Sequence, residues 1–527
     1  MAKRTVPAVA PGGKTQIPKK GPYQFAIPRA SSHDVTNTEQ KAKMSRDTYQ
    51  DGPVTRKYEE LAQEIEALIA AGTLRPGERL PSVRESVASR GVSPSTVFEA
   101  YYLLERRGMV EARPRSGYFV AQRASAAGKE PGLVQPESGL REVAVNDLVL
   151  EVLGSVRHRD VVPLGSAFPS PGLFPLDRLA RGMSSAMRAL QAREVLENLS
   201  PGSTDLRRQI ALRYVATGTL ASAEEIIITS GAMEALNLCL QAVTTPGDVV
   251  AIEAPAFYGC LQALERLQLK AVEVATHPRH GVQVDALREV LQRHPVKACW
   301  FMPNFQNPTG ALMPPQQRKA LVDLLAQHRV PLIEDDVYGE LYFGVRRPLP
   351  AKSFDREGWV MHCSSFSKNL APGYRIGWAA AGRFAPQVER LKLTTTLSVA
   401  VPSQVAVLHF LQHGAFDKHL RNLRATLSVQ RERALRLATK HLPSGTRITQ
   451  PEGGYFLWAE LPPDIDALQL QRLALSQNIS LAPGHLFSAD RRFRNHVRLN
   501  FGHPAPEQLE PALKTVGRLA ARIGAQA

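Results

Sequence analysis

The sequence predicts a multidomain protein with a small helical unit near its N-terminus and a large α/β domain over the rest of the chain. At 527 residues, the chain is longer than a single domain usually is. From Pro163 onward, short β-branched runs such as Ile226–Ile228 and Pro331–Ile333 alternate with longer amphipathic stretches. This alternation is typical of an α/β domain built on a mostly parallel sheet.

The composition indicates a folded chain with a basic surface. Hydrophobic residues make up 43% and charged residues 22% of the sequence, which excludes global disorder. Lys and Arg number 65 against 49 Asp and Glu, so the formal net charge is +16. This excess favours a polyanionic partner such as nucleic acid, although an ordinary solvated surface can also be basic.

The cysteines lie far apart, with no C-x-x-C pair and no histidine cluster nearby, so neither a disulfide framework nor a metal site is expected. They are Cys239, Cys260, Cys299 and Cys363. The basic start is followed by an apolar stretch that Pro7 and Pro11 interrupt, so no signal peptide is expected. No apolar run has membrane-spanning length. We therefore expect a cytoplasmic protein that has no contact with a membrane.

Four segments differ in their local composition. Residues 1–52 are rich in Pro, Lys, Ser and Thr without apolar periodicity and predict a disordered basic tail. Residues 53–122 open with Tyr58, Leu61 and Ile65 at helical spacing and predict a compact helical unit. Residues 123–162 mix Gly, Pro, Ser and charge around one weak helical stretch and predict a linker. Residues 163–527 make up the α/β domain.

The helical unit carries the pattern of a winged helix-turn-helix. A short helix capped by Ser82 and a second helix over Thr96–Arg107, capped by Ser93 or Ser95, flank a turn at Gly91. The second helix is expected to bury Val97, Ala100, Tyr101 and Leu104. Residues 114–120 predict a β-hairpin wing with a basic tip. Such a unit inserts its second helix into the major groove while the wing grips phosphates.

Three elements of this unit resemble the GntR family of bacterial repressors: L-P-S-x-R at residues 80–84, V-S-x-x-T-V at residues 92–97, and a later G-x-x-V at residues 117–120. The resemblance implies DNA contacts at Arg84, Ser95, Thr96, Arg115 and Gly117. Pro94 stands where the family usually carries a basic residue, so the contact made there is expected to be missing. A winged helix that docks another protein instead of DNA is the alternative interpretation.

The stretch Ser364–Trp378 carries the strongest chemical signal. A lysine that forms an imine must lose its proton easily, and hydroxyls and an arginine nearby can hold a phosphate. Lys368 suits the imine, and Ser365, Ser367 and Arg375 suit the phosphate. A lone lysine is usually a solvated charge, but this arrangement resembles the fold-type I aminotransferases. The resemblance implies that Lys368 holds pyridoxal 5′-phosphate (PLP) as a Schiff base.

A carboxylate that faces the pyridine nitrogen keeps the nitrogen protonated and makes the ring an electron sink. Asp335 follows an apolar strand in the stretch Glu334–Tyr338. We assign this role to Asp335 and not to Asp336, because the family places its aspartate three residues before a tyrosine that bonds the ring hydroxyl. That tyrosine is Tyr338. The resemblance thus implies Lys368, Asp335 and Tyr338 as the catalytic residues.

Three further stretches match other parts of the cofactor. Asn307 lies in a turn and can donate to the same ring oxygen. Ser230, Gly231 and Ala232 lie between a strand and a helix, so their backbone N–H groups point at the phosphate. A strand followed by such a turn is weak evidence alone. Tyr258 is the family candidate for stacking on the ring, and a buried core aromatic is the alternative.

Arg498 lies on an expected strand where the family binds a substrate carboxylate through a bidentate fork, with Asn307 beside it. A structural ion pair is the alternative. The resemblance covers about residues 163–520 and implies a large mixed or parallel sheet with a smaller C-terminal α+β part. Two departures stand out. The run Glu197–Gly202 lacks the tyrosine that reaches the neighbouring subunit's phosphate, and Ala167 replaces a common glycine.

A GntR-type unit fused to an aminotransferase-like domain is similar to the MocR subfamily of transcription regulators. The resemblance implies a homodimer with swapped DNA-binding units. We expect an amino acid or amine effector to react with the Lys368 imine and alter operator binding. A working aminotransferase with an accessory DNA-binding unit, active at least in a half-reaction, is the main alternative. A plain PLP sensor without an amino acid ligand is the weaker one, and it predicts that Arg498→Ala leaves the effector response intact.

Overall fold

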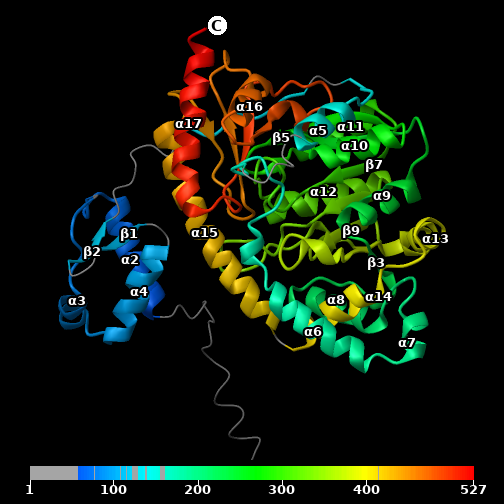
Figure 1. Ribbon diagram of the computed structural model, residues 1–527, viewed down its shortest axis with the longest axis horizontal. Coiled ribbons are helices and arrows are strands. Elements are labelled where there is room, and N and C mark those ends of the chain that lie inside the picture. Colours follow the sequence, from blue (N-terminus) through cyan, green and yellow to red (C-terminus); the bar gives the residue numbers. More distant parts are fainter. Residues whose placement is uncertain are drawn as a thin grey trace, which may run out of the picture.

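The computed structural model describes residues 57–75, 77–106, 109–113, 116–120, 129–136, 139–154, 161–413 and 415–526. The predicted tail and Arg115 lie outside these residues. Figure 1 shows the small unit, in blue, as a body of its own, followed by a large domain that runs from cyan to red. The predicted fold class is confirmed: a winged helix precedes a large α/β domain that ends in a smaller α+β part.

The small unit is a three-helix bundle with a two-stranded wing. It comprises α2 (Lys57–Ala70), α3 (Val83–Arg90), α4 (Pro94–Arg106), β1 (Val110–Arg113) and β2 (Gly117–Val120). The two strands pair antiparallel. All four residues predicted to face inward on α4 are fully buried. Among them, the Tyr101 hydroxyl donates to the Pro81 carbonyl at 2.7 Å and lies 2.7 Å from the Ser86 hydroxyl, which ties α4 to α3.

The helix starts of this unit follow from their capping residues. Ser82 caps α3 as predicted: its Oγ accepts from Glu85 N at 3.2 Å, and its N–H donates to the Glu85 carboxylate at 2.7 Å. Helix α4 begins two residues before the predicted start at Thr96, because Pro94 suits the first helical position and Ser93 Oγ accepts from Thr96 N at 3.2 Å. Of the two predicted caps, the cap is therefore Ser93.

The described part of the expected linker is packed against the large domain. Backbone hydrogen bonds in both directions, each 2.9 Å, join Arg141 to Ala271 on strand β5 (Lys270–His277) of the main sheet. Helix α5 (Asn146–Gly154) follows, and Glu265 Oε2 accepts from the N–H groups of Val145 and Asn146 at 2.7 and 3.0 Å. Much of the segment expected to separate the two domains therefore lies on the surface of one of them.

The large domain is built on an eight-stranded mixed sheet in the order β3-β10-β9-β8-β7-β4-β5-β6. Its strands are β3 (Ile226–Thr229), β4 (Val249–Ala254), β5 (Lys270–His277), β6 (Gly281–Val282), β7 (Val296–Phe301), β8 (Leu332–Asp335), β9 (Val360–Ser365) and β10 (Gly377–Ala380). The central strands β5, β4, β7, β8 and β9 run parallel, whereas β10 and β6 run antiparallel to their neighbours.

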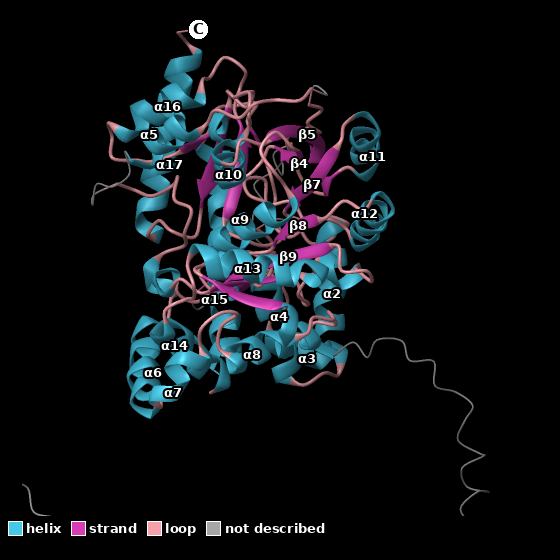
Figure 2. Cartoon of the chain, turned by 90° about the vertical axis from the view of Figure 1, so that its right-hand side faces the viewer, coloured by secondary structure: helices cyan, strands magenta, loops and turns pink. Residues whose placement is uncertain are grey.

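Helices cover both faces of this sheet. Figure 2 shows α11 and α12 on one face and α9 and α10 on the other. The helices of this domain are α6 (Leu176–Ala189), α7 (Ala192–Glu197), α8 (Thr204–Ala216), α9 (Ala232–Val243), α10 (Tyr258–Arg266), α11 (Val284–Arg293), α12 (Pro315–His328), α13 (Ala385–Thr395) and α14 (Val401–Gln412). Because both faces are covered, the central strands are almost entirely buried, and the hydrophobic core lies between sheet and helices.

The C-terminal part has an antiparallel sheet of its own. After the long helix α15 (Ala415–His441), strands β11 (Arg447–Ile448), β12 (Phe456–Glu460), β14 (His496–Asn500) and β13 (Ala482–Pro483) lie in that spatial order. Helices α16 (Ala467–Leu475) and α17 (Pro506–Gly524) pack beside them. Within the described residues, no helix combines the length and apolarity that a membrane crossing needs.

The parallel strands bring several polar residues to one edge of the main sheet. Glu253 lies near the carboxyl end of β4, a turn over residues 302–311 follows β7, Asp335 ends β8 and Ser365 ends β9. Open parallel sheets bind ligands at the carboxyl edge of their strands. The topology therefore places the predicted cofactor residues at the edge where a ligand site is expected.

The winged-helix unit has a hydrophobic core of its own, so its stability can be tested separately. Leu104→Ala is expected to lower the free energy of unfolding of this unit by about 2–5 kcal/mol, because a fully buried leucine leaves a cavity. Scanning calorimetry should show a shifted transition for the unit and an unchanged one for the large domain. Gln63→Ala, on the exposed side of α2, is the control. An equal shift of both transitions would contradict the independence of the two cores.

Candidate cofactor site

The predicted phosphate ligands come together around Arg375. Its Nη1 donates to Ser367 Oγ at 3.1 Å and its Nη2 to the Ser230 carbonyl at 2.8 Å. Gly231 precedes α9 with a φ of 89°, and a Cβ on this residue would lie 2.3 Å from Arg375 Nη2. The N–H groups of Ser230 and Gly231, predicted to point at the phosphate, donate instead to Glu234 Oε2 at 2.6 Å and to the Thr229 carbonyl at 2.8 Å. The groups left for an anion are therefore the Arg375 guanidinium, the serine hydroxyls and the positive end of the α9 dipole.

Lys368 lies beside this cradle with its amine directed at backbone and aromatic groups. Its Nζ donates to the Ala167 carbonyl at 2.8 Å and lies 3.7 Å from the centre of the Phe168 ring. Burial and the positive charges of Arg498 and Arg375 lower the pKa of Lys368 to about 7, against the opposing effect of Asp335. A substantial fraction of the amine is therefore unprotonated at neutral pH, as a nucleophilic lysine requires.

Asp335 is buried at the end of β8, and its Oδ1 atom has no hydrogen bond partner. Burial and the negative charge of Asp336 raise the pKa of Asp335 to about 7, while Lys368 opposes the shift. A buried carboxylate oxygen without a donor is costly. A protonated ring nitrogen would supply that donor.

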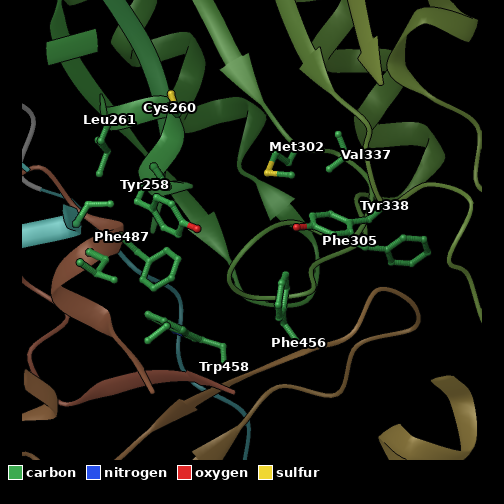
Figure 3. Packing of buried hydrophobic residues seen from close by; sticks show 14 of the residues in the cluster. Tyr258, Cys260, Leu261, Met302, Phe305, Val337, Tyr338, Phe456, Trp458 and Phe487 are labelled. Atoms are coloured by element: carbon green, nitrogen blue, oxygen red, sulfur yellow. The ribbon is translucent and has the colours of Figure 1, made fainter. Parts of the chain in front are cut away.

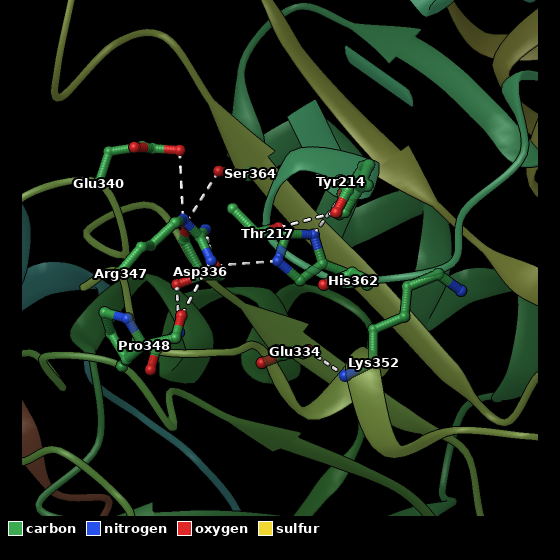
Figure 4. A network of polar contacts seen from close by, with 12 residues as sticks. Tyr214, Thr217, Glu334, Asp336, Glu340, Arg347, Pro348, Lys352, His362 and Ser364 are labelled. Atoms are coloured by element: carbon green, nitrogen blue, oxygen red, sulfur yellow. Dashed lines mark hydrogen bonds and ion pairs between the residues drawn. The ribbon is translucent and has the colours of Figure 1, made fainter. Parts of the chain in front are cut away.

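Asp336 lies next to Asp335 but belongs to a separate polar network, shown in Figure 4. Its carboxylate accepts from Arg347 Nη2 at 2.7 Å and Asn304 Nδ2 at 3.0 Å and lies 3.0 Å from His362 Nε2. Burial alone would raise the pKa of Asp336, but Arg347 and His362 lower it overall. Of the two aspartates, Asp335 is therefore the one with a free oxygen on the cavity.

Arg498 and Asn307 are in direct contact. Arg498 Nη1 donates to Asn307 Oδ1 at 2.9 Å, and Nη2 donates to the Gly165 carbonyl at 2.9 Å. The guanidinium is fully buried and has its Nε without a partner. Because Asn307 Oδ1 accepts from Arg498, the Nδ2 group of Asn307 remains as the donor for a ring oxygen.

Aromatic rings lie close to Arg498, and Figure 3 shows three of them, Tyr258, Phe456 and Phe487, in one packed cluster. The Arg498 guanidinium lies 4.2 Å from the ring centre of Phe456 and 5.3 Å from that of Phe487. Tyr258 begins α10 and lines the cavity with one face. Tyr338 is buried against Tyr455, with ring centres 5.4 Å apart, and burial raises the pKa of its hydroxyl. Tyr258 and Tyr338 are thus part of both the hydrophobic core and the cavity wall.

These residues enclose a cavity of about 240 Å³. It is lined by Tyr258, Asn307, Asp335, Tyr338, Ser365, Ser367, Lys368 and Arg375. The free oxygen of Asp335 suits a ring nitrogen, and the close approach of Gly231 to Arg375 leaves a cradle that suits a phosphate. The low pKa of Lys368 suits an amine that reacts with an aldehyde carbon. The residues present therefore fit PLP.

Two contacts at this site have no signal in the sequence. The Ala167 carbonyl accepts from both Lys368 Nζ and the Tyr455 hydroxyl, at 2.8 and 3.0 Å. Phe168 covers the amine and is 39% exposed, so it forms part of the cavity mouth. Both residues lie about 200 positions from Lys368 in the chain, and only the fold brings them to it.

The predicted DNA contacts lie on the surface of the small unit. Arg84 is exposed on α3, and Ser95 and Thr96 lie in the first turn of α4. Gly117 opens β2 with a φ of 98°, and Arg115 lies outside the described residues. Two aromatic side chains on α4 that were not predicted as contacts are also exposed, Phe98 at 52% and Tyr102 at 55%. They follow the buried Val97 and Tyr101 by one position and so point to solvent.

Comparisons with known proteins agree with this geometry. Residues 57–120 match the family of bacterial regulatory proteins named gntR, and residues 168–516 match the family Aminotransferase class I and II. The chain is 48% identical over 464 residues to the uncharacterized HTH-type transcriptional regulator YdcR of Escherichia coli (strain K12), a match that covers 88% of this chain and 99% of that protein.

Two solved structures resemble the large domain. Pyrococcus horikoshii kynurenine aminotransferase, in complex with PMP, superposes with a TM-score of 0.66 at 30% identity over 71% of this chain and 94% of that one. LysN, the α-aminoadipate aminotransferase of Thermus thermophilus, complexed with N-(5′-phosphopyridoxyl)-L-leucine, has a TM-score of 0.65 at 29% identity over 72% of this chain and 98% of that one. Such neighbours imply PLP as the cofactor of this fold.

Fold and site define an aminotransferase-like domain of fold type I joined to a GntR-type DNA-binding unit. The chain belongs to the MocR subfamily of GntR-type transcription regulators. Both halves of the resemblance drawn from the sequence are therefore confirmed.

Gly231→Ala is expected to weaken PLP binding at least about tenfold, because its Cβ would collide with Arg375 in the phosphate cradle. The dissociation constant can be measured by absorbance titration of the cofactor-free protein. Gly218→Ala is the matched control: its φ of 77° is as strained, but nothing lies within 4 Å of its Cβ. Equal losses in both variants would assign the effect to backbone strain and contradict the cradle.

Proposed function

We propose that this regulator senses an amino acid or amine at its PLP site and converts the reaction into a change of operator binding. The effector displaces Lys368 from the cofactor, and Arg498 holds the carboxylate of an amino acid effector. The observation that carries the proposal is the attachment of the linker beside the turn that presents Asn307. The same chain therefore contains a reactive site, a DNA-binding unit and a connection between them.

The connection begins at Glu130, which joins both parts of the cofactor domain. Its Oε1 accepts from Gln450 N of the C-terminal part at 3.0 Å, and its Oε2 pairs with Arg279 of the main domain at 2.9 Å. The neighbouring Lys129 carbonyl accepts from Ile448 N at 3.1 Å. A shift of one part against the other must therefore strain or break the contacts of Glu130.

Both partners of Glu130 lead back to the site. The Arg279 carbonyl accepts from Leu312 N at 3.0 Å and so fixes the end of the turn that carries Asn307. Gln450 follows β11, which pairs with β12, and Trp458 of β12 lies opposite Arg498 in the register. A ligand that binds Arg498 and Asn307 therefore acts on both contacts of Glu130. Such coupling needs two states of this joint with different ligand affinities.

The chemistry rests on three side chains. PLP supplies an electrophilic carbon and an electron sink when it is bound. Lys368, with a pKa of about 7, can accept or release a proton at neutral pH. Asp335 holds the ring nitrogen, and Arg498 offers a forked donor in an apolar surrounding, where a carboxylate is bound most strongly.

Aminotransferase activity is the second candidate, because the same three residues complete the set that a half-reaction needs. The titrating amine of Lys368 supports it. Turnover with an L-amino acid and a 2-oxo acid, measured beside DNA binding, separates the two functions. Sustained turnover without measurable DNA affinity would overturn the regulatory proposal, whereas DNA binding with a single half-reaction at most is expected.

We also propose a cytoplasmic homodimer with exchanged DNA-binding units. Apolar side chains exposed near α7 and α8 support it, with Leu196 at 71% and Leu220 at 76% exposure. The chain from Val120 to Lys129 spans nine steps, at most about 32 Å when extended, which limits how far an exchanged unit can lie from its own anchor. Sedimentation velocity should give a dimer.

Glu130→Gln is expected to uncouple the two units, because the amide loses the ion pair with Arg279. Cofactor absorbance and amino acid affinity should stay within about twofold of the wild type. DNA affinity is measured on a genomic DNA fragment selected by the wild-type protein. Addition of effector should change this affinity at least about fivefold in the wild type and hardly at all in Glu130→Gln. Glu151→Gln, which removes an exposed ion pair with Arg472, is the control. An unchanged response in Glu130→Gln would contradict this route.

A further inference from the structure

The turn that presents Asn307 is held by the preceding residue, Gln306. Gln306 is fully buried and uses each of its polar groups. Its Nε2 donates to the Pro255 carbonyl at 2.7 Å and to Glu253 Oε2 at 3.4 Å, and its Oε1 accepts from the N–H and hydroxyl of Thr309 at 2.9 and 2.6 Å. The Gln306 side chain thus connects Thr309 within the turn to Pro255 outside it.

The backbone of Gln306 closes the same turn. Its N–H donates to the Ala311 carbonyl at 3.0 Å, and its carbonyl accepts from Gly310 N at 2.6 Å. Asn307 is the next residue along the chain. The contacts of Gln306, which does not line the cavity, therefore fix the turn that carries Asn307.

Glu253 anchors this arrangement to the sheet. It lies near the carboxyl end of β4, is 3% exposed, and accepts from Met302 N at 3.1 Å as well as from Gln306. Met302 follows β7, which lies between β4 and β8 in the sheet. One carboxyl group therefore joins two strand ends to the turn, on the opposite side of β7 from Asp335.

We propose that Glu253 and Gln306 are positioning residues: they fix the turn that carries Asn307 and so determine how Asn307 meets the ring oxygen of the bound cofactor. This inference rests on the PLP site of the proposed function. Neither residue lines the cavity, so both act through Asn307.

The protonation state of Glu253 fits this role. Burial, with a smaller effect from the nearby carboxyl of Asp335, raises the pKa of Glu253 to about 8. Asp335 on β8 and Cys260 on α10 are the titratable groups that interact with it electrostatically, while Met302 and Gln306 contribute hydrogen bonds. At neutral pH Glu253 is thus mostly protonated and adds little negative charge beside Asp335.

The first experiment measures how the absorbance of bound PLP changes with pH in the full chain. Loss of the Asn307 donor in Asn307→Ala should shift the midpoint by at least about half a pH unit, or about threefold in proton affinity. Gln306→Met should shift it in the same direction, and the double variant should shift it no further. Thr309→Val, which removes one donor to Gln306, should give a smaller shift of the same sign.

Gln471→Met is the matched control, because Gln471 is equally buried but lies on α16 and accepts from Leu481 N. It should lower stability without moving the midpoint. A normal midpoint in both Gln306→Met and Thr309→Val, or additive shifts in the double variant with Asn307→Ala, would overturn the positioning role. So would an unshifted midpoint in Asn307→Ala.

The second experiment needs no cofactor. Because the pKa of Glu253 is higher in the folded chain than its usual 4.5, its contribution to stability is present below about pH 4.5 and is lost as pH rises to about 8. The melting temperature of the wild type should therefore fall over this range relative to Glu253→Gln. A difference in melting temperature between the wild type and Glu253→Gln that stays constant with pH would show that Glu253 is not protonated at neutral pH. Failure to bind PLP would overturn the proposed function, whereas the pH dependence of the melting temperature, measured without PLP, tests Glu253 separately.

Discussion

The hydrogen bond from Arg498 to Asn307 is the contact on which the rest of the site depends. It joins strand β14 of the C-terminal part to the turn after β7 of the main sheet. The same bond leaves one donor of Asn307 for the proposed cofactor and holds Arg498, the proposed ligand of an effector carboxylate, beside it. Glu130 joins the same two parts of the domain at the surface. In the proposed function, ligand binding at Arg498 and linker attachment at Glu130 therefore both depend on how these two parts of the domain lie against each other.

Burial of charge explains the shifted pKa values of the site. Lys368 and Asp335 both have a pKa of about 7, since each is removed from water and faces a charge of the same sign. Asp336, one residue further on, is held ionised by Arg347 and His362. Two neighbouring aspartates thus differ in role because one has partners and the other opens to the cavity.

Local features could be predicted from the sequence, because they depend on neighbouring residues. The cap at Ser82, the inward face of α4 and the strand before Ser230 are of this kind. The family resemblance supplied the residues around Lys368, whose geometry the fold then provides. Contacts between distant segments could not be predicted, since no pattern links Glu130 to Gln450 or Glu253 to Gln306 before the chain is folded.

In the proposed function, chemistry at Lys368 is transmitted to DNA. The most direct test titrates the PLP-loaded protein with L-amino acids while cofactor absorbance and affinity for a selected genomic DNA fragment are recorded in the same samples. We expect both signals to change with one midpoint and Lys368→Ala to lose both responses. DNA affinity that stays constant while the absorbance change saturates would contradict it.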